Sequence, residues 1–250
     1  MRVGTTSYDA IGEGYAKHRQ SDPRIAARIE AALGDAATVL NVGAGTGSYE
    51  PPDRLVIAVE PPATMIRQRR RDAAPVVRGV GERLPFPSDS FDAAMALMTI
   101  HHWADWRRGL SELCRVAPRR VVWTFHPAFN ERFWLMRDYF PASMRTPAVT
   151  DVPLVAEVAD AIGATRVESV MVPADCTDLF GWASWRYPER YLDDDVCRAT
   201  SVLAQLSGAD LRAGQERLAE DLRTGRWHSR YRYLLDLDAV DAGFRLVIRD

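Results

Sequence analysis

The chain lacks long apolar runs and has few cysteines. Within its 250 residues, no stretch approaches the ~20 uninterrupted apolar residues of a membrane-spanning helix, and the N-terminal segment lacks the apolar core of a signal peptide. Three cysteines are present, Cys114, Cys176 and Cys197, and an odd number without close pairs argues against a disulfide framework. We therefore expect a cytoplasmic protein with no membrane partner.

A strong charge of either sign is also missing. The chain carries 32 Lys and Arg against 34 Asp and Glu, a net charge of -2, so no overall positive field attracts nucleic acid. Its composition, 47% hydrophobic and 26% charged, is ordinary for a globular enzyme. We expect a small-molecule partner and no nucleic acid, and the sequence leaves the oligomeric state open.

Short apolar runs alternate with helical patterns between residues 36 and 126. Strand candidates lie at 38–42, 55–59, 76–80, 91–100 and 120–125. Such alternation predicts right-handed crossovers and an open parallel sheet with helices on both faces. Two more strand candidates, at 166–172 and 244–248, bring the number to seven. We therefore predict an α/β fold with a Rossmann-like, doubly wound, mostly parallel seven-stranded sheet.

The pattern changes after the fifth strand candidate. About 70 residues separate the last two strand candidates, and they contain helical patterns around 196–206 and 211–222. A segment of this length is too long for a simple loop. We predict a core domain over 1–174 and 236–250, in which residues 1–35 form an N-terminal helical cover, and an inserted helical, aromatic-rich substrate cap over 175–235.

The first strand candidate runs directly into Gly43, Gly45 and Gly47. Closely spaced glycines after a strand allow the backbone to approach a ligand and aim free N–H groups at it. Glu60, at the end of the next strand candidate, can accept hydrogen bonds from both hydroxyls of a ribose. Ser48 occupies the third glycine position of the dinucleotide fingerprint, which argues against a nicotinamide or flavin cofactor. Glu60 could instead only stabilise the start of a helix.

The glycine loop and the segments that follow it resemble the motifs of one enzyme family. In order, these segments are residues 39–47 (VLNVGAGTG), 59–60 (VE), 82–86 (ERLPF), 90–92 (SFD) and 101–103 (HHW). Together they are similar to the class I S-adenosylmethionine-dependent methyltransferases, and more narrowly to the ubiquinone/menaquinone-biosynthesis-like type 11 branch. The resemblance covers about residues 8 to 126.

The resemblance implies S-adenosyl-L-methionine as the cofactor, S-adenosyl-L-homocysteine as its product, and a role for several residues. Glycines of the loop would line the methionine part, Glu60 would bind the ribose, and the backbone near Gly81 would bind the adenine. Thr99, at the end of the fourth strand, would lie close to the sulfonium. The implied cofactor-binding set is Gly43, Ala44, Gly45, Gly47, Glu60, Pro61, Met65, Gly81, Glu82, Thr99 and Tyr15.

The sequence departs from the family pattern at three places. Asn41 stands where the family usually has an acid, so a neutral amide would make any contact with an ammonium group there. Val80 stands at a position that is often Asp. Pro51 and Pro52 interrupt the short connection between the first two strands, so the usual crossover helix must be very short.

Histidines follow two of the central strand candidates. If the methyl acceptor must lose a proton, histidine is the side chain best matched to neutral pH. His101 is the first candidate for this base, because strand alternation would place it on the same side as Thr99; His126 and His102 are the others. These residues could instead cap the next helix and pack. We expect no metal, since no third ligand is spaced nearby.

The predicted cap is rich in aromatic residues, which suits a small and partly apolar acceptor. The candidate substrate-binding residues are Trp182, Trp185, Arg186 and Tyr8. The rings could instead form the core of the cap, and Arg186 could pair with Glu189. The sequence thus indicates methyl transfer to an O, N or C atom. A cofactor-binding protein with another role, such as a cyclisation helper or scaffold, and a nicotinamide oxidoreductase are the alternatives.

Overall fold

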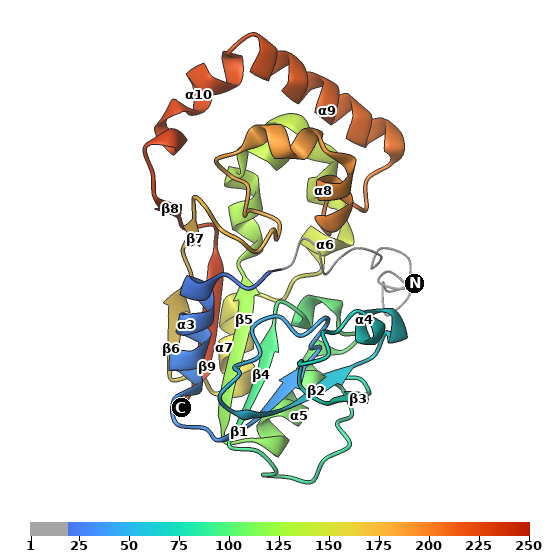
Figure 1. The fold of residues 1–250 in the computed structure, drawn as a ribbon, viewed down its shortest axis with the longest axis vertical. Helices are drawn as coiled ribbons and strands as arrows, with labels where there is room; N and C mark the ends of the chain where they lie inside the picture. The colour runs from blue at the N-terminus through green and yellow to red at the C-terminus, as the bar shows by residue number, and fades with distance from the viewer. Residues whose placement is uncertain (1–19) are drawn as a thin grey trace.

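The computed structural model describes residues 20–250, and its centre is a seven-stranded sheet (Figure 1). The strands of this sheet are β1 (Thr38–Val42), β2 (Leu55–Glu60), β3 (Val76–Arg78), β4 (Ala93–Leu97), β5 (Arg119–Phe125), β6 (Arg166–Ser169) and β9 (Phe244–Arg249). Their spatial order is β3-β2-β1-β4-β5-β9-β6. The first five strands pair in parallel, and β9 runs antiparallel to both β5 and β6. The predicted α/β sheet is confirmed.

Helices cover both faces of the sheet because the strands bury side chains on both sides. Helix α3 (Pro23–Leu33) packs on one face, and helices α5 (Trp106–Val116) and α7 (Val155–Ile162) pack together on the other. Successive side chains of β1 point to opposite faces of the sheet. Val39 therefore lies in the core under α3, and Leu40 lies in the core under α5. The start of α3 is fixed by Asp22, whose carboxylate accepts a hydrogen bond from the Arg24 amide.

Several elements are shorter than the sequence predicts. The fourth strand ends at Leu97, and residues Ile100–His102 form a short 3₁₀ helix. Helix α4 (Ala63–Arg67) occupies only part of the range 63–71, where the sequence favours a helix. Between β1 and β2 the described chain forms turns and no helix, so the crossover helix that was predicted to be very short is absent there. Loops and turns therefore surround the carboxyl ends of β1 and β4.

An upper layer lies over the carboxyl ends of the parallel strands (Figure 1). It contains α6 (Pro147–Thr150), α8 (Asp194–Ala199), α9 (Gly208–Arg223) and α10 (Arg226–Leu235). A small antiparallel ribbon of β7 (Val172–Pro173) and β8 (Ala239–Val240) joins the two ends of the inserted segment. Residues 127–150 also belong to this layer, since Phe133 stacks on Trp182 at 4.0 Å and Trp134 contacts Trp227 at 5.2 Å between ring centroids. The packed cap thus extends beyond the predicted 175–235.

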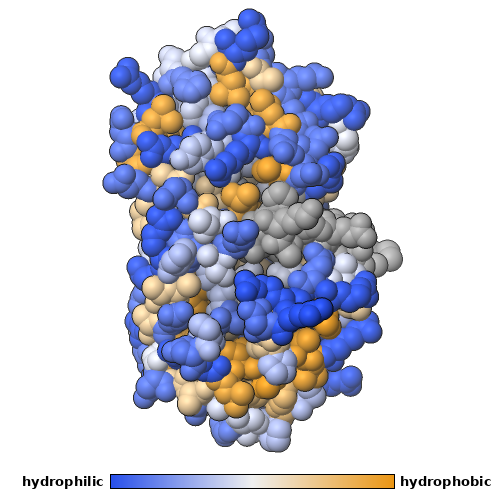
Figure 2. Space-filling view, viewed as in Figure 1, coloured by the Kyte–Doolittle hydropathy of each residue, from blue (hydrophilic) through white to orange (hydrophobic). Residues whose placement is uncertain are grey.

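The aromatic rings of the upper layer mostly form its own core. Trp185, Tyr191, Trp227 and Tyr231 are each at most 1% exposed. On the face shown in Figure 2, hydrophilic residues cover most of this layer, and hydrophobic residues are exposed at several places between them. No helix in the described part of the chain is long and apolar enough to cross a membrane.

Candidate active site

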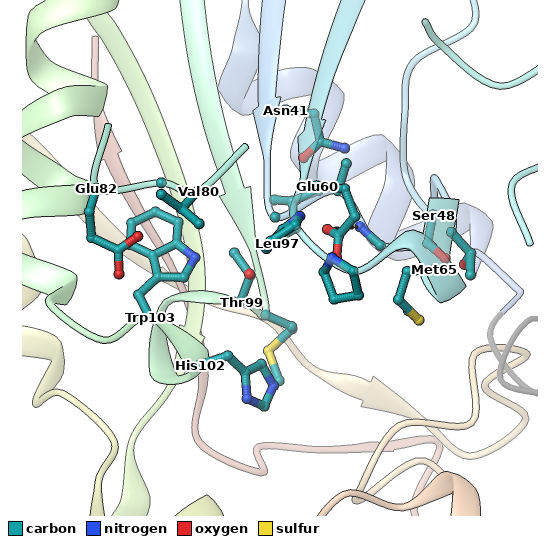
Figure 3. Close-up of a pocket in the computed structure, with 18 of the residues that line it drawn as sticks. Asn41, Ser48, Glu60, Met65, Val80, Glu82, Leu97, Thr99, His102 and Trp103 are labelled. Atoms are coloured by element: carbon teal, nitrogen blue, oxygen red, sulfur yellow. Dashed lines mark hydrogen bonds between the residues drawn. The ribbon is translucent and has the colours of Figure 1, made fainter. Parts of the chain in front are cut away.

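A cleft of about 450 Å³ opens where β1, β2 and β4 end, and residues between 41 and 123 line it (Figure 3). Its volume falls in the range of roughly 300 to 1,000 Å³ that is typical of small-molecule sites. Nine of the predicted cofactor-binding residues line it: Gly43, Ala44, Gly45, Glu60, Pro61, Met65, Gly81, Glu82 and Thr99. The fold therefore brings most of the predicted cofactor-binding residues to one cleft.

The glycine loop needs its glycines for two separate reasons. Gly43 and Gly45 have φ angles of 71° and 55°, a region that residues with a Cβ rarely adopt. A Cβ at Gly43 would also lie only 2.0 Å from Oγ1 of Thr99. The loop can therefore turn tightly against the end of β4, which leaves its backbone on the wall of the cleft.

Glu60 joins the tip of β2 to the glycine loop. Its Oε2 accepts a hydrogen bond of 2.7 Å from the Gly45 amide, and the residue is 6% exposed. Burial raises the pKa of the Glu60 carboxyl to about 7, although the Gly45 amide and the nearby Arg69 guanidinium both favour its charged form. Glu60 is therefore a hydrogen-bond acceptor whose charge changes close to neutral pH.

Gly47 lies on the other side of the loop and does not line the cleft. A Cβ at Gly47 would lie 3.1 Å from Oε2 of Glu50 and 3.3 Å from Nη1 of Arg69. These two side chains form a buried ion pair at 2.8 Å, with exposures of 7% and 4%. Arg69 also donates to the Gly45 carbonyl at 3.3 Å. Gly47 thus makes room for an ion pair that supports the loop from behind, where a crossover helix is missing.

Trp103 forms the far wall of the cleft, beside Val80 and Glu82 (Figure 3). The indole packs between two glycines, since a Cβ at Gly81 would lie 3.0 Å from it and a Cβ at Gly109 only 2.2 Å. The Glu82 carboxylate accepts a hydrogen bond from the Asp105 amide at 3.2 Å. A flat apolar ring next to open backbone suits one face of an aromatic ligand.

The structure corrects the placement of His101. Because β4 ends at Leu97, strand alternation does not extend to residue 101, and it is His102 that lines the cleft with Thr99. Burial lowers the pKa of His102 to about 4 and that of His101 well below its usual range, so both rings are neutral at neutral pH. His126 accepts a hydrogen bond from the Ala128 amide at 3.3 Å and lines neither the cleft nor the cavity beside it.

A second, more apolar cavity of about 90 Å³ adjoins the cleft under the upper layer. Met98 and His102 line both spaces. Met98 has a φ of 53°, and strained backbone of this kind gathers at functional sites. Other residues of this cavity are His101, Phe125, Asn130, Phe133, Phe180, Trp182 and Phe244. Residues of the upper layer and of the core domain thus meet around this cavity, beside the cleft.

Of the predicted substrate residues that the structure describes, Trp182 alone lines this second cavity. Trp185 is 1% exposed, and its Nε1 donates to the Val172 carbonyl at 3.2 Å, so it belongs to the core of the upper layer. Arg186 donates to the carbonyls of Leu235 and Leu237 at the end of α10 instead of facing a ligand. Tyr8 and Tyr15 lie outside the described residues.

Sequence reasoning missed several residues of the cleft, among them Tyr49, Trp103, Asp105, Arg108 and Trp123. Trp103 could have been found, because it ends the HHW segment at the carboxyl end of a central strand. Tyr49 could not, since its position depends on an irregular turn in which its φ is 62°. Among residues 20–250, no three His, Cys, Asp or Glu side chains gather as metal ligands would.

Comparison with known proteins supports the family. A family model described as "Methyltransferase domain" matches residues 40–120. The rice protein 2-methyl-6-phytyl-1,4-hydroquinone methyltransferase 2 is 29% identical over 119 residues, which are 44% of this chain and 34% of the relative. The uncharacterized methyltransferase YcgJ of Bacillus subtilis is 30% identical over 114 residues, 41% of each chain. The match thus spans well under half the length of these curated relatives.

A solved structure matches nearly the whole chain. It belongs to an Anabaena variabilis protein proposed to be a methyltransferase from an antibiotic biosynthesis pathway, with 29% identity and a TM-score of 0.84 over 93% of this chain and 99% of that one. This similarity includes the upper layer, which the family model does not reach. Together these similarities support a class I S-adenosylmethionine-dependent methyltransferase.

Proposed function

We propose that this chain transfers a methyl group from S-adenosylmethionine to an O, N or C atom of a small, partly apolar acceptor. One observation carries the proposal: a buried carboxylate, Glu60, is hydrogen-bonded to a glycine loop in a cleft that opens beside an apolar cavity. The cleft fits the family's cofactor, because it combines exposed loop backbone, an acceptor for ribose hydroxyls and a flat wall at Trp103.

Each part of the cleft would hold one part of the cofactor. Glu60 accepts hydrogen bonds from the ribose hydroxyls, the backbone at Gly81 and the ring of Trp103 bind the adenine, and Gly43 and Gly45 approach the methionine end. When bound, S-adenosylmethionine supplies a methyl carbon attached to a positively charged sulfur. The task of the protein is then to position the acceptor atom and exclude water.

The second cavity is the proposed place for the acceptor. Its phenylalanine rings and Trp182 suit an apolar ring, and it meets the cleft at Met98 and His102. A hydroquinone is the acceptor named for the rice relative, and a hydroxylated ring matches this environment. His102 lies where the two spaces meet, and we assign to it the proton that a hydroxyl or amine must lose. Burial lowers its pKa to about 4, so the ring is neutral but a weak base, and the proton must move as the methyl group is transferred.

The direct test is turnover. Purified chain is incubated with S-adenosylmethionine and a panel of alkylated hydroquinones, phenols and amines, and S-adenosylhomocysteine is measured. We expect formation of S-adenosylhomocysteine that depends on one of the acceptors. Tight cofactor binding without turnover on any acceptor would instead favour the alternative of a cofactor-binding protein with another role.

Replacing His102 by glutamine is expected to lower kcat by about 10²- to 10⁴-fold on an acceptor that must lose a proton. Affinity for S-adenosylhomocysteine should stay within about twofold, since the change removes only a proton acceptor. Because its pKa is lowered, the wild-type ring stays neutral down to about pH 4, so protonation of His102 should cause no loss of kcat between pH 8 and 5. His126→Gln is the control, and an equal loss in both variants would contradict the assignment.

A further inference from the structure

Asn130 is a buried polar residue in the wall of the second cavity. It belongs to a 3₁₀ helix (Pro127–Arg132) that follows β5, and it is 5% exposed. Its Oδ1 accepts a hydrogen bond from Nε1 of Trp182 at 3.4 Å. Because an indole N–H can only donate, this contact fixes which end of the amide is the oxygen. The other end, Nδ2, is buried and has no hydrogen-bond partner among residues 20–250, so it is an unused donor.

The surroundings of this donor are mostly apolar. Phe125, Phe180 and Phe244 line the same cavity, and the ring of Trp182 stacks on Phe133 with 4.0 Å between the ring centroids. A donor that stays unpaired among such side chains costs free energy, and a hydrogen bond made there is stronger than one in water. A ligand that brings an oxygen to Nδ2 of Asn130 therefore removes a penalty that the protein carries alone.

Asn130 and His102 lie on different parts of the cavity wall. His102 and Met98 line both the cavity and the cleft, whereas Asn130 lines the cavity and not the cleft. The cavity measures about 90 Å³, less than the roughly 150 Å³ of a cavity that takes one benzene ring, so it holds no more than a single ring. An acceptor whose reacting atom lies at the cleft near His102 would thus turn the far side of its ring towards Asn130.

We propose that Asn130 selects the methyl acceptor by donating a hydrogen bond from Nδ2 to a ring oxygen substituent remote from the methylated atom. This inference rests on the proposed function, since it assumes that the acceptor occupies the second cavity. The acceptor is then a single ring that carries, besides its reacting hydroxyl or amine, a second oxygen of the carbonyl, ether or hydroxyl kind. Trp182 is a positioning residue, because its indole holds the amide in the orientation that leaves the nitrogen for the ligand.

The first experiment compares two ring probes of nearly the same shape. They are para-methoxyphenol and para-ethylphenol, which differ in having an ether oxygen or a methylene group at the same place. Each is titrated by calorimetry into the full wild-type chain saturated with S-adenosylhomocysteine. We expect para-methoxyphenol to bind about 5- to 50-fold more tightly, because para-ethylphenol leaves the buried donor unpaired.

The second experiment removes the donor. Asn130→Leu should abolish the preference, so that para-methoxyphenol binds no more tightly than para-ethylphenol. Affinity for S-adenosylhomocysteine should stay within about twofold, since Asn130 does not line the cleft, and this also shows that the variant is folded. The control is Thr200→Val, which removes another polar group from the cavity wall, a hydroxyl that donates to the Val196 carbonyl. It should leave the preference unchanged.

A third variant tests the orientation of the amide. Trp182→Phe keeps an aromatic ring beside Phe133 but removes the indole N–H, so the Asn130 amide is free to turn over and present its oxygen. The preference for para-methoxyphenol should fall to less than about threefold. A residue that only filled space would leave the ratio of the two affinities as it is in the wild type.

The outcomes separate this inference from the proposed function. If wild-type protein gives no heat with S-adenosylhomocysteine, the proposed function itself fails. If it binds S-adenosylhomocysteine but binds the two phenols equally or binds neither, or if Asn130→Leu keeps the preference, only the role of Asn130 is overturned. If Asn130→Leu does not fold, an unchanged preference in Trp182→Phe overturns it. A preference that Asn130→Leu loses and Thr200→Val keeps supports it.

Discussion

Replacing Arg69 by methionine is expected to lower the free energy of unfolding by about 3 to 5 kcal/mol, the cost of leaving a buried charge without its partner. Arg69 and Glu50 are 4% and 7% exposed, so solvent screens their interaction little. The substitution also removes the hydrogen bond to the Gly45 carbonyl, so the glycine loop should loosen. Urea denaturation measures the loss, and the melting temperature should fall by about 6 to 20 °C.

The neighbouring Arg70 offers a matched control. Arg70 pairs with Asp72 on the surface, where their side chains are 82% and 68% exposed. Arg70→Met should therefore change the free energy of unfolding by less than about 0.5 kcal/mol. Similar losses in the two variants would contradict the role given to the buried ion pair.

The affinity for S-adenosylhomocysteine should rise about tenfold between pH 6 and pH 8. Burial raises the pKa of Glu60 to about 7, so at pH 6 the carboxyl is mostly protonated and accepts the ribose hydroxyls poorly. Above pH 7 it is ionised, and hydrogen bonds to a charged acceptor are worth about 1.5 to 3 kcal/mol. Glu60→Gln should lose this amount at pH 8 and show a nearly flat affinity over the same range. Calorimetry at several pH values measures both.

Stability without ligand should show the opposite dependence. A carboxyl whose pKa is raised on folding contributes stability that is fully present below its unfolded pKa of 4.5 and is lost as the pH rises through about 7. At pH 8, Glu60→Gln should therefore raise the free energy of unfolding of the ligand-free protein, by up to about 3 kcal/mol. At pH 4 the variant should match the wild type. A variant that binds normally, or that is less stable at pH 8, would show that Glu60 serves the fold rather than the ligand.

The sheet was predictable because its signals are local. Each central strand is a short apolar run, and the glycines after β1 mark the turn that begins the cleft. The end of β4 was not predictable, because the apolar run continues to Ile100 while the backbone leaves the strand at Met98 with a φ of 53°. That one local change moves His101 away from Thr99 and brings His102 to the cleft.

Long-range packing explains most of the rest. No pattern in the sequence indicates that Phe133 and Trp182, far apart in the chain, stack in one upper layer. The sequence also does not indicate that Glu50 and Arg69 form an ion pair beside Gly47. Most of the predicted cofactor-binding residues line one cleft because their motif is contiguous or lies at strand ends. Trp185 and Arg186 contact other parts of the protein instead, because aromatic and basic residues can pack within a cap as well as bind a ligand.

Strand β9 follows the cap in the sequence, yet it lies between β5 and β6 and pairs with both. While the chain is being synthesised, β6 therefore cannot pair with β9 until the ribosome has made the whole of the upper layer. During that interval one side of β5 presents unpaired N–H and C=O groups, which are a template for association with other chains. The order of the elements thus leaves this edge of β5 open until β9 has been made and has emerged from the ribosome.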